Sequence, residues 1–198
     1  MSEARVQGLP RQVIHYRRAR PEDYGAIVEL NEANFTANLA ADERDDGFLS
    51  AVFSFEQTAA MAEDLGTMVA IVDGGLAGFL CAFRNDFAHG SPVVAKMIES
   101  YPRMKFEGKS LTSFNSYVYG PVCIAREYRR KGLLRALYEA QKQDLAGRFE
   151  IGVALIGRSN PHSFQAHVAG LGMVETGEFE VQGKLFAAVA FRLPPRPG

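Results

Sequence analysis

The residues best suited to chemistry lie in a basic turn between a strand-like segment and a helix-like segment. Val122 to Ile124 end the apolar segment, and Gly132 opens the most regular helical pattern of the chain. The basic residues of this stretch are Arg126, Arg129, Arg130, Lys131 and Arg135. The first amides of a helix have no partner inside it, and the helix dipole makes that end positive. The stretch therefore predicts an anion site suited to a pyrophosphate, where Gly132 lets the backbone come close.

A solvated turn with a glycine at a tight corner is the simpler alternative for this stretch. A dinucleotide-binding fingerprint needs three glycines and a P-loop needs GxxxxGK[ST], and the stretch matches neither pattern. The choice between an anion site and a solvated turn therefore depends on the secondary-structure elements that surround this stretch.

The first half of the chain has clear signals for helices and a hairpin. Pro21 opens a helix, and Ser54-x-x-Gln57 has the form of a capping box before another. Thr67 to Val72 and Leu76 to Phe83 are strand-like, and the Asp-Gly-Gly between them predicts a hairpin.

The second half alternates strands and helices. Ser116 to Ile124 predicts a strand that Gly120-Pro121 should interrupt, because proline lacks the amide that a ladder needs. The other expected elements are a helix from Gly132 to Ala146, a strand from Glu150 to Ile156, a short helix from Asn160 to about Ala169, and a hairpin of Val174 to Val181 with Leu185 to Arg192. Their order predicts an α+β (mixed α/β) fold, with a central mixed, mainly antiparallel sheet of six to seven strands flanked by helices on both faces.

The expected organisation is one domain over residues 13–193, with a flexible arm at 1–12 and a flexible tail at 194–198. Residues 85–112 form an insert, which predicts a binding loop or lid with a short helix after Ser91. The aromatic rings in or beside the insert should pack on the domain or line a substrate pocket; they are Tyr101, Phe106 and Phe114. The last strand is apolar on both faces, so it should be central or lie at a dimer seam.

Composition argues against several classes of protein. The net charge of −1 disfavours a general nucleic-acid or membrane-surface role, and no apolar run reaches the roughly 18 residues of a transmembrane helix. The first residues do not have the apolar region of a signal peptide. Cys81 and Cys123 are expected to be reduced core thiols, and the cysteine spacing predicts no metal site. A cytoplasmic location is the expectation.

The basic turn resembles the acetyl-CoA signature of the GNAT superfamily of acetyltransferases, [QR]-x-x-G-x-[GA]. The matching residues are Arg129-x-x-Gly132-x-Leu134, in which Leu134 departs from the usual small residue. The resemblance implies that the turn binds the phosphates of acetyl-CoA through Arg129, Arg130, Lys131, Gly132, Leu133, Leu134 and Arg135. It also implies that the strand before the turn, Val122, Cys123 and Ile124, pairs with the pantetheine arm where two central strands part.

A second segment resembles the N-x-x-[AS]-x-x-x-[YH] pattern of the same family. It runs from Asn160 to His167, and Leu171-Gly172-Met173 follows in place of the usual L-G-F, after one extra residue. By resemblance Asn160 and Ser163 contact the pantetheine or the phosphates, and His167 holds the position of the general acid. Asn160 is also expected to cap its helix.

Acetyl transfer to an amine needs a neutral amine, donors for an oxyanion and a proton donor for the departing thiolate. A backbone amide near Ile124 is the candidate oxyanion donor, and His167 exchanges its proton near pH 7. Leu155 stands where some family members have a glutamate, so the general base stays open. The candidates are Asn31, Glu32, Tyr117, Tyr119 and an ordered water.

The predicted function is transfer of the acetyl group of acetyl-CoA to a primary amine, by direct attack of the amine on the thioester. The acceptor is a small molecule, an amino acid or a peptide N-terminus. The alternative is a non-catalytic acyl-CoA-binding or sensing module, which the absence of the glutamate at Leu155 keeps open. The expected partners are acetyl-CoA and an amine, without metal, nucleic acid or membrane, and the chain is expected to be a monomer or homodimer.

Overall fold

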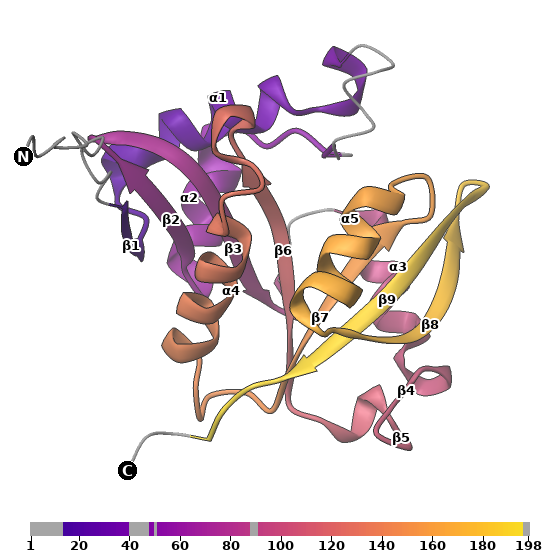
Figure 1. Ribbon diagram of the computed structural model, residues 1–198. Coiled ribbons are helices and arrows are strands. Elements are labelled where there is room, and N and C mark those ends of the chain that lie inside the picture. The colour runs from indigo at the N-terminus through magenta and orange to yellow at the C-terminus, as the bar shows by residue number, and fades with distance from the viewer. Residues whose placement is uncertain (1–13, 40–47, 50, 88–90, 196–198) are drawn as a thin grey trace, which may run out of the picture.

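The computed structural model describes residues 14–39, 48–49, 51–87 and 91–195 (Figure 1). Residues 1–13, 40–47, 50, 88–90 and 196–198 lie outside the described residues, and with them the predicted N-terminal arm and most of the predicted tail. None of the helices in the described chain is long and apolar enough to cross a membrane.

The described strands build a seven-stranded sheet in the order β1-β2-β3-β6-β7-β9-β8. They are β1 Ile14–Arg18, β2 Thr67–Val72, β3 Gly75–Arg84, β6 Ser116–Ile124, β7 Ile151–Gly157, β8 Val174–Val181 and β9 Lys184–Arg192. Among these pairs only β6 and β7 run parallel. The predicted fold class, a mixed and mainly antiparallel sheet, is therefore confirmed. Strand β9 lies between β7 and β8, which explains why both of its faces are apolar.

Helices cover both faces of the sheet (Figure 1). One face carries α1 Tyr24–Ala33, α2 Phe55–Asp64 and α3 Pro92–Ser100; the other carries α4 Leu133–Asp144, α5 Pro161–Gln165 and the π-helical turn η7 Ala166–Gly170. Alternate residues of a strand point to opposite faces. Accordingly Phe79 of β3 packs in the first core, whereas Leu80 packs in the second beside Leu137.

Local signals placed several element boundaries correctly. The Ser54 side chain accepts a hydrogen bond from the Gln57 amide at 3.2 Å, and the Gln57 side chain accepts one from the Ser54 amide at 2.9 Å. The predicted capping box is thus confirmed. Between β2 and β3, Asp73 and Gly74 both have positive φ, as the tight hairpin turn requires.

The described part of the insert belongs to the core rather than to a lid. It comprises α3, the turns η4 Tyr101–Arg103 and η5 Leu111–Ser113, and the two-stranded sheet of β4 Lys105–Phe106 with β5 Lys109–Ser110. Tyr101, Phe106 and Phe114 are buried in the core on the α1 face. Of the two predicted roles, packing on the domain or lining a substrate pocket, these rings have the first.

Gln141 ties α4 to the two strands beneath it. Its side chain accepts a hydrogen bond from Tyr117 Oη at 3.0 Å and donates one to the Cys81 carbonyl at 3.0 Å, and the residue is almost fully buried. A buried polar group that loses its partner costs about 1–3 kcal/mol.

We therefore expect Gln141→Leu to lower the free energy of unfolding by about 3 kcal/mol, because it leaves the Tyr117 hydroxyl and the Cys81 carbonyl unpaired. Chemical denaturation measures the change. Gln143→Leu is the matched control, since Gln143 is exposed on the same helix. Equal stability of the two variants would contradict the role assigned to Gln141.

Candidate functional site

Strands β6 and β7 part halfway along their length (Figure 1). In the described chain they pair only where Ser116 to Val118 lie beside Ile151 to Val153, while β7 stays paired with β9 to its end. On the other side of β6, the register against β3 shifts between Leu80 and Ala82, which leaves Gly120-Pro121 outside the ladder. The prediction that this pair would break strand pairing is confirmed.

The separation exposes one edge of β6 to a cleft. The Ala125 amide donates to the Ala77 carbonyl on the β3 side, at 2.9 Å. Because successive amides of a strand point in opposite directions, the amides of Ile124 and Val122 face the edge that β7 leaves open. The Ile124 amide, the candidate oxyanion donor, therefore points to the cleft.

The basic turn curls tightly before α4. It contains the short turn η6 Arg126–Tyr128, and then Arg130 and Gly132 have φ of 60° and 85°. The first hydrogen bond of α4 runs from the Ala136 amide to the Gly132 carbonyl, so the amides of Leu133 and Leu134 have no acceptor within the helix. Beyond the neighbouring residues of the chain, a Cβ built on Gly132 would meet no atom of the described residues within 4 Å. This end of α4 is open, positive and rich in donors.

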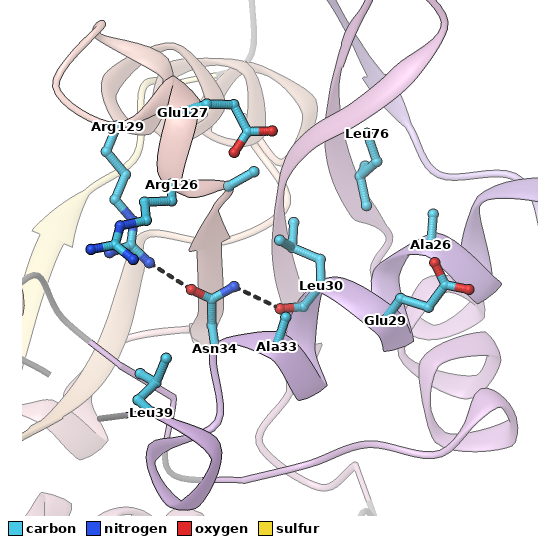
Figure 2. A pocket seen from close by; sticks show the side chains of 11 residues that line it. Ala26, Glu29, Leu30, Ala33, Asn34, Leu39, Leu76, Arg126, Glu127 and Arg129 are labelled. Atoms are coloured by element: carbon cyan, nitrogen blue, oxygen red, sulfur yellow. Dashed lines mark hydrogen bonds between the residues drawn. The ribbon is translucent and has the colours of Figure 1, made fainter. Parts of the chain in front are cut away.

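The basic side chains of the turn have different partners. Arg129 donates from Nε to the Ile124 carbonyl at 3.1 Å and from Nη2 to Asn34 Oδ1 at 2.6 Å, and Figure 2 shows the second bond. Arg135 donates to the Gly170 carbonyl, which joins α4 to η7. The ammonium of Lys131 lies 5.6 Å from the centre of the Tyr128 ring. Arg129 thus holds the end of β6 against the end of α1.

Asn160 makes two contacts with its amide group. Its Oδ1 accepts a hydrogen bond from the Ser163 amide at 3.1 Å, so the expected helix cap is present. Its Nδ2 donates to the carbonyl of Phe48 at 3.1 Å. The neighbouring Leu49 donates its amide to the Asn34 carbonyl at 2.9 Å. Residues 48–49 are therefore held by α1 on one side and by the start of α5 on the other.

Variants of Asn160 separate these two contacts. Asn160→Asp keeps the cap acceptor and loses the donor to Phe48, whereas Asn160→Ala loses both. We expect the free energy of unfolding to fall by about 1 kcal/mol for aspartate and about 2 kcal/mol for alanine, as measured by chemical denaturation. An aspartate variant as stable as the wild type would contradict a stabilising contact to Phe48.

His167 lies in the π-helical turn η7, which follows α5 without a break. A π turn holds one more residue than an α turn, and here it accommodates the extra residue that precedes Leu171. His167 is 4% exposed, and its ring meets the Tyr119 ring edge to face, with centroids 5.7 Å apart.

The proton on His167 can be assigned from its contacts. Nδ1 lies 2.7 Å from the Ser163 carbonyl oxygen, which can only accept, so Nδ1 carries the proton. In the neutral ring Nε2 then has a free lone pair. Burial lowers the pKa of His167 below its usual value, and the hydrogen bond to Ser163 opposes that shift. The ring is therefore neutral at pH 7, with Nε2 as a proton acceptor.

A cavity of about 320 Å³ lies where these elements meet. Of the predicted site residues, those that line it are Val122, Cys123, Ile124, Arg129, Arg130, Gly132, Leu133, Leu134, Asn160, Ser163 and His167. Lys131 and Arg135 lie outside the lining, because their side chains turn to Tyr128 and to Gly170.

The cavity also has lining residues that the sequence analysis missed: Asn34, Phe48, Leu49, Tyr128, His162 and Ala166. Tyr128 directly precedes the first motif, and His162 and Ala166 lie inside the second, so the sequence patterns already marked this part of the chain. Asn34, Phe48 and Leu49 come from the α1 side, and no local pattern marks them.

The residues considered as general base lie outside this lining. The Asn31 side chain donates a hydrogen bond from Nδ2 to the Ala51 carbonyl at 3.1 Å, and its Oδ1 accepts one from the Phe53 amide at 2.9 Å. Tyr117 is bonded to Gln141, and burial raises the pKa of Tyr119 well above its usual range. Glu32 is exposed on α1. Two titratable residues of the lining are buried, Cys123 and His167. Burial raises the pKa of the Cys123 thiol to about 12, so of these two His167 is the one with a lone pair that can take up a proton near pH 7.

No family model and no curated protein matches the chain by sequence. Solved structures resemble it over most of its length. An N-acetyltransferase from Staphylococcus aureus Mu50 has a TM-score of 0.60 at 16% identity, and the match covers 91% of this chain and 99% of that one. The structure of yncA from Salmonella typhimurium with its cofactor acetyl-CoA has a TM-score of 0.59 at 16% identity, covering 93% and 96%.

The ribosomal-protein-S18-alanine N-acetyltransferase from Escherichia coli also has a TM-score of 0.59, at 13% identity, and the match covers 93% of this chain and 97% of that one. Identities this low speak for the fold alone. The parted strands β6 and β7, the turn before α4 and these similar structures agree, and the chain has the fold of the GNAT-family acetyltransferases.

Proposed function

We propose that the chain is an N-acetyltransferase that moves the acetyl group of acetyl-CoA to a primary amine, with residues 13–193 as its single domain. One observation carries the proposal. The open edge of β6, the free amides of α4 and the neutral His167 line the same cavity. An anion site, an extended backbone edge and a proton acceptor are the three features that the reaction needs together.

The residues present fit acetyl-CoA. The amides of Leu133 and Leu134 and the side chain of Arg130 are suited to its pyrophosphate, and the part of the chain that the structure describes leaves the space in front of Gly132 open. The open edge of β6 at Val122 to Ile124 offers amides and carbonyls to the pantetheine arm. When bound, acetyl-CoA supplies an activated acyl group, and the Ile124 amide is the donor for its carbonyl oxygen.

His167 has the opposite proton role from the one that the family position implies. As a general acid it would need a charged imidazolium, which burial disfavours. With Nδ1–H held by the Ser163 carbonyl, Nε2 can instead accept a proton from the ammonium or the attacking amine. We assign His167 as the general base, acting directly or through one water, and the imidazolium that this step forms can then give its proton to the departing CoA thiolate.

A non-catalytic acyl-CoA-binding module is the second candidate. Leu155 favours it, because this apolar residue stands where a glutamate is expected and packs against the core. Both candidates predict binding of CoA, so turnover must separate them.

The test is release of free CoA thiol from acetyl-CoA over a panel of amines: alkyl diamines, amino acids and peptides with free N-termini. We expect thiol release above the acceptor-free rate for at least one class, together with a product heavier by one acetyl group. Tight binding of acetyl-CoA without release for any acceptor would favour the binding module. Absence of binding would refute both functions.

A further inference from the structure

The backbone that follows the candidate oxyanion donor is held on both of its sides. In a planar trans peptide group the carbonyl and the amide point in opposite directions. The peptide group between Ile124 and Ala125 donates its N–H to the Ala77 carbonyl of β3 at 2.9 Å. Its C=O points to the open side of β6 and accepts a hydrogen bond from Arg129 Nε at 3.1 Å. Each end of this peptide group therefore has a partner.

The preceding peptide group, between Cys123 and Ile124, carries the donor amide and lies close against β3. Its carbonyl oxygen faces Gly78: a Cβ built on this glycine would lie 2.8 Å from that oxygen and 2.7 Å from Ile124 Cδ1. Both separations are shorter than the roughly 3.5–4.0 Å at which non-bonded carbon atoms attract each other. Because β3 approaches so closely, the donor peptide cannot move toward it. The side on which the donor can move is the cleft, where Arg129 holds the Ile124 carbonyl.

Asn34, at the end of α1, holds the Arg129 side chain. Asn34 Oδ1 accepts a hydrogen bond from Arg129 Nη2 at 2.6 Å, and Asn34 Nδ2 donates one to the Leu30 carbonyl at 2.9 Å (Figure 2). Asn34 is 8% exposed, so its amide group is held in the interior. Arg129 lines the cofactor cavity on one side and a second cavity, of about 480 Å³, on the other. Its guanidinium therefore has room to move when the acceptor at position 34 is removed.

We propose that Asn34 is a positioning residue for acetyl transfer, because through Arg129 it keeps the Ile124 amide aimed at the carbonyl oxygen of acetyl-CoA. The inference rests on the proposed function, and Asn34 itself touches no reacting atom in it. An oxyanion donor is effective only when it is aimed at the position where the charge develops, and removal of one donor costs about 10²–10³ in kcat. A donor that is present but displaced should cost less, about tenfold.

Two variants of Asn34 isolate its contact with Arg129. Asn34→Asp and Asn34→Leu both lose the donor to the Leu30 carbonyl, but only aspartate keeps an oxygen that can accept from Arg129. We expect kcat, measured as thiol release at saturating acetyl-CoA, to fall about tenfold in Asn34→Leu and less than about threefold in Asn34→Asp. The KM for acetyl-CoA should change little in Asn34→Leu, because the contact acts on the transition state and not on the phosphates.

Asn38→Leu is the matched control. Asn38 Nδ2 donates to the Glu32 carbonyl at 2.8 Å, so this residue is also bonded to the end of α1, but it is exposed and lines neither cavity. We expect Asn38→Leu to leave kcat unchanged. If Asn34→Leu does not fold, Asn34→Ala takes its place, since alanine also lacks the acceptor and adds no bulk.

A second measurement needs no acceptor amine. The infrared stretch of the thioester carbonyl is recorded for bound acetyl-CoA that is isotopically labelled at the acetyl carbonyl carbon. A hydrogen bond from the Ile124 amide polarises this carbonyl and lowers its frequency. We expect a lower frequency on the wild type and on Asn34→Asp than on Asn34→Leu. A residue that only stabilises the fold would change the free energy of unfolding and leave this frequency as it is.

Equal carbonyl frequencies on Asn34→Leu and Asn34→Asp would overturn the inference, whatever their kcat, and would leave the proposed function standing. Wild-type protein that binds no acetyl-CoA would refute the proposed function, and the inference with it. A calorimetric titration of the wild type with acetyl-CoA therefore precedes the comparison of the variants.

Discussion

Replacing Gly132 with valine is expected to lower the affinity for CoA at least about tenfold while the protein stays folded. A Cβ at this position meets none of the described residues within 4 Å apart from its neighbours in the chain, so the side chain finds room in the free protein. That room lies in front of the free amides of α4, where the pyrophosphate is proposed to bind. The methyl groups would therefore displace the ligand and not the protein.

The variant also has a conformational cost. Gly132 has φ of 85°, where a side chain costs about 2 kcal/mol, and this corresponds to a Tm lower by roughly 6 °C for a chain of this size. Gly74→Val separates the conformational cost of a side chain at positive φ from the loss of CoA affinity. Gly74 has φ of 84°, equally open surroundings and a place in the β2–β3 turn, outside the cofactor cavity.

Both valine variants should lose similar thermal stability, but only Gly132→Val should lose CoA in a calorimetric titration. Equal CoA affinity in folded Gly132→Val and in the wild type would refute the proposed phosphate site at α4. Because the proposed function depends on that site, the acetyl transfer would be refuted with it.

Removal of the His167 imidazole is expected to reduce kcat by about 100-fold, the usual contribution of a general base. CoA affinity should change little in His167→Ala, because the phosphates are proposed to bind at α4. His162→Ala is the matched control: His162 lines the same cavity from α5, the helix that leads into η7, but it is exposed. The activity of both variants is measured as the rate of thiol release with the best acceptor.

The pH dependence distinguishes a base from an acid at His167. Burial lowers its pKa, so the neutral form persists to a pH below the usual value of about 6.5. We expect the ratio of wild-type to His167→Ala activity to stay constant above pH 7 and to fall as the pH drops through the pKa of His167. The ratio cancels the ionisation of the acceptor amine.

The opposite profile would refute the assignment of His167 as a base. If the imidazolium donates the proton, the ratio should instead fall as the pH rises through the pKa. A ratio near one at every pH would show that His167 only packs against Tyr119.

Features encoded by neighbouring residues were predictable. The capping box at Ser54 and the β2–β3 turn depend on hydrogen bonds and backbone angles within four residues. The interruption at Gly120-Pro121 follows from one missing amide. By contrast, the insert was expected to form a loop or lid, and its described residues pack in the core, because only contacts with distant strands could decide where its rings lie.

The sequence by itself determined the interruption at Gly120-Pro121 and the glycine-led turn before α4, because both depend on local backbone chemistry. The order of strands and helices predicted the sheet class, and the resemblance to the GNAT superfamily implied that two central strands part. Only the tertiary structure decided that Asn34, Phe48 and Leu49 join the cavity and that β9 is central. It also decided which nitrogen of His167 carries the proton, through the turn of η7 and the burial of the ring. These features depend on which distant surfaces pack together, and packing has no short-range sequence pattern.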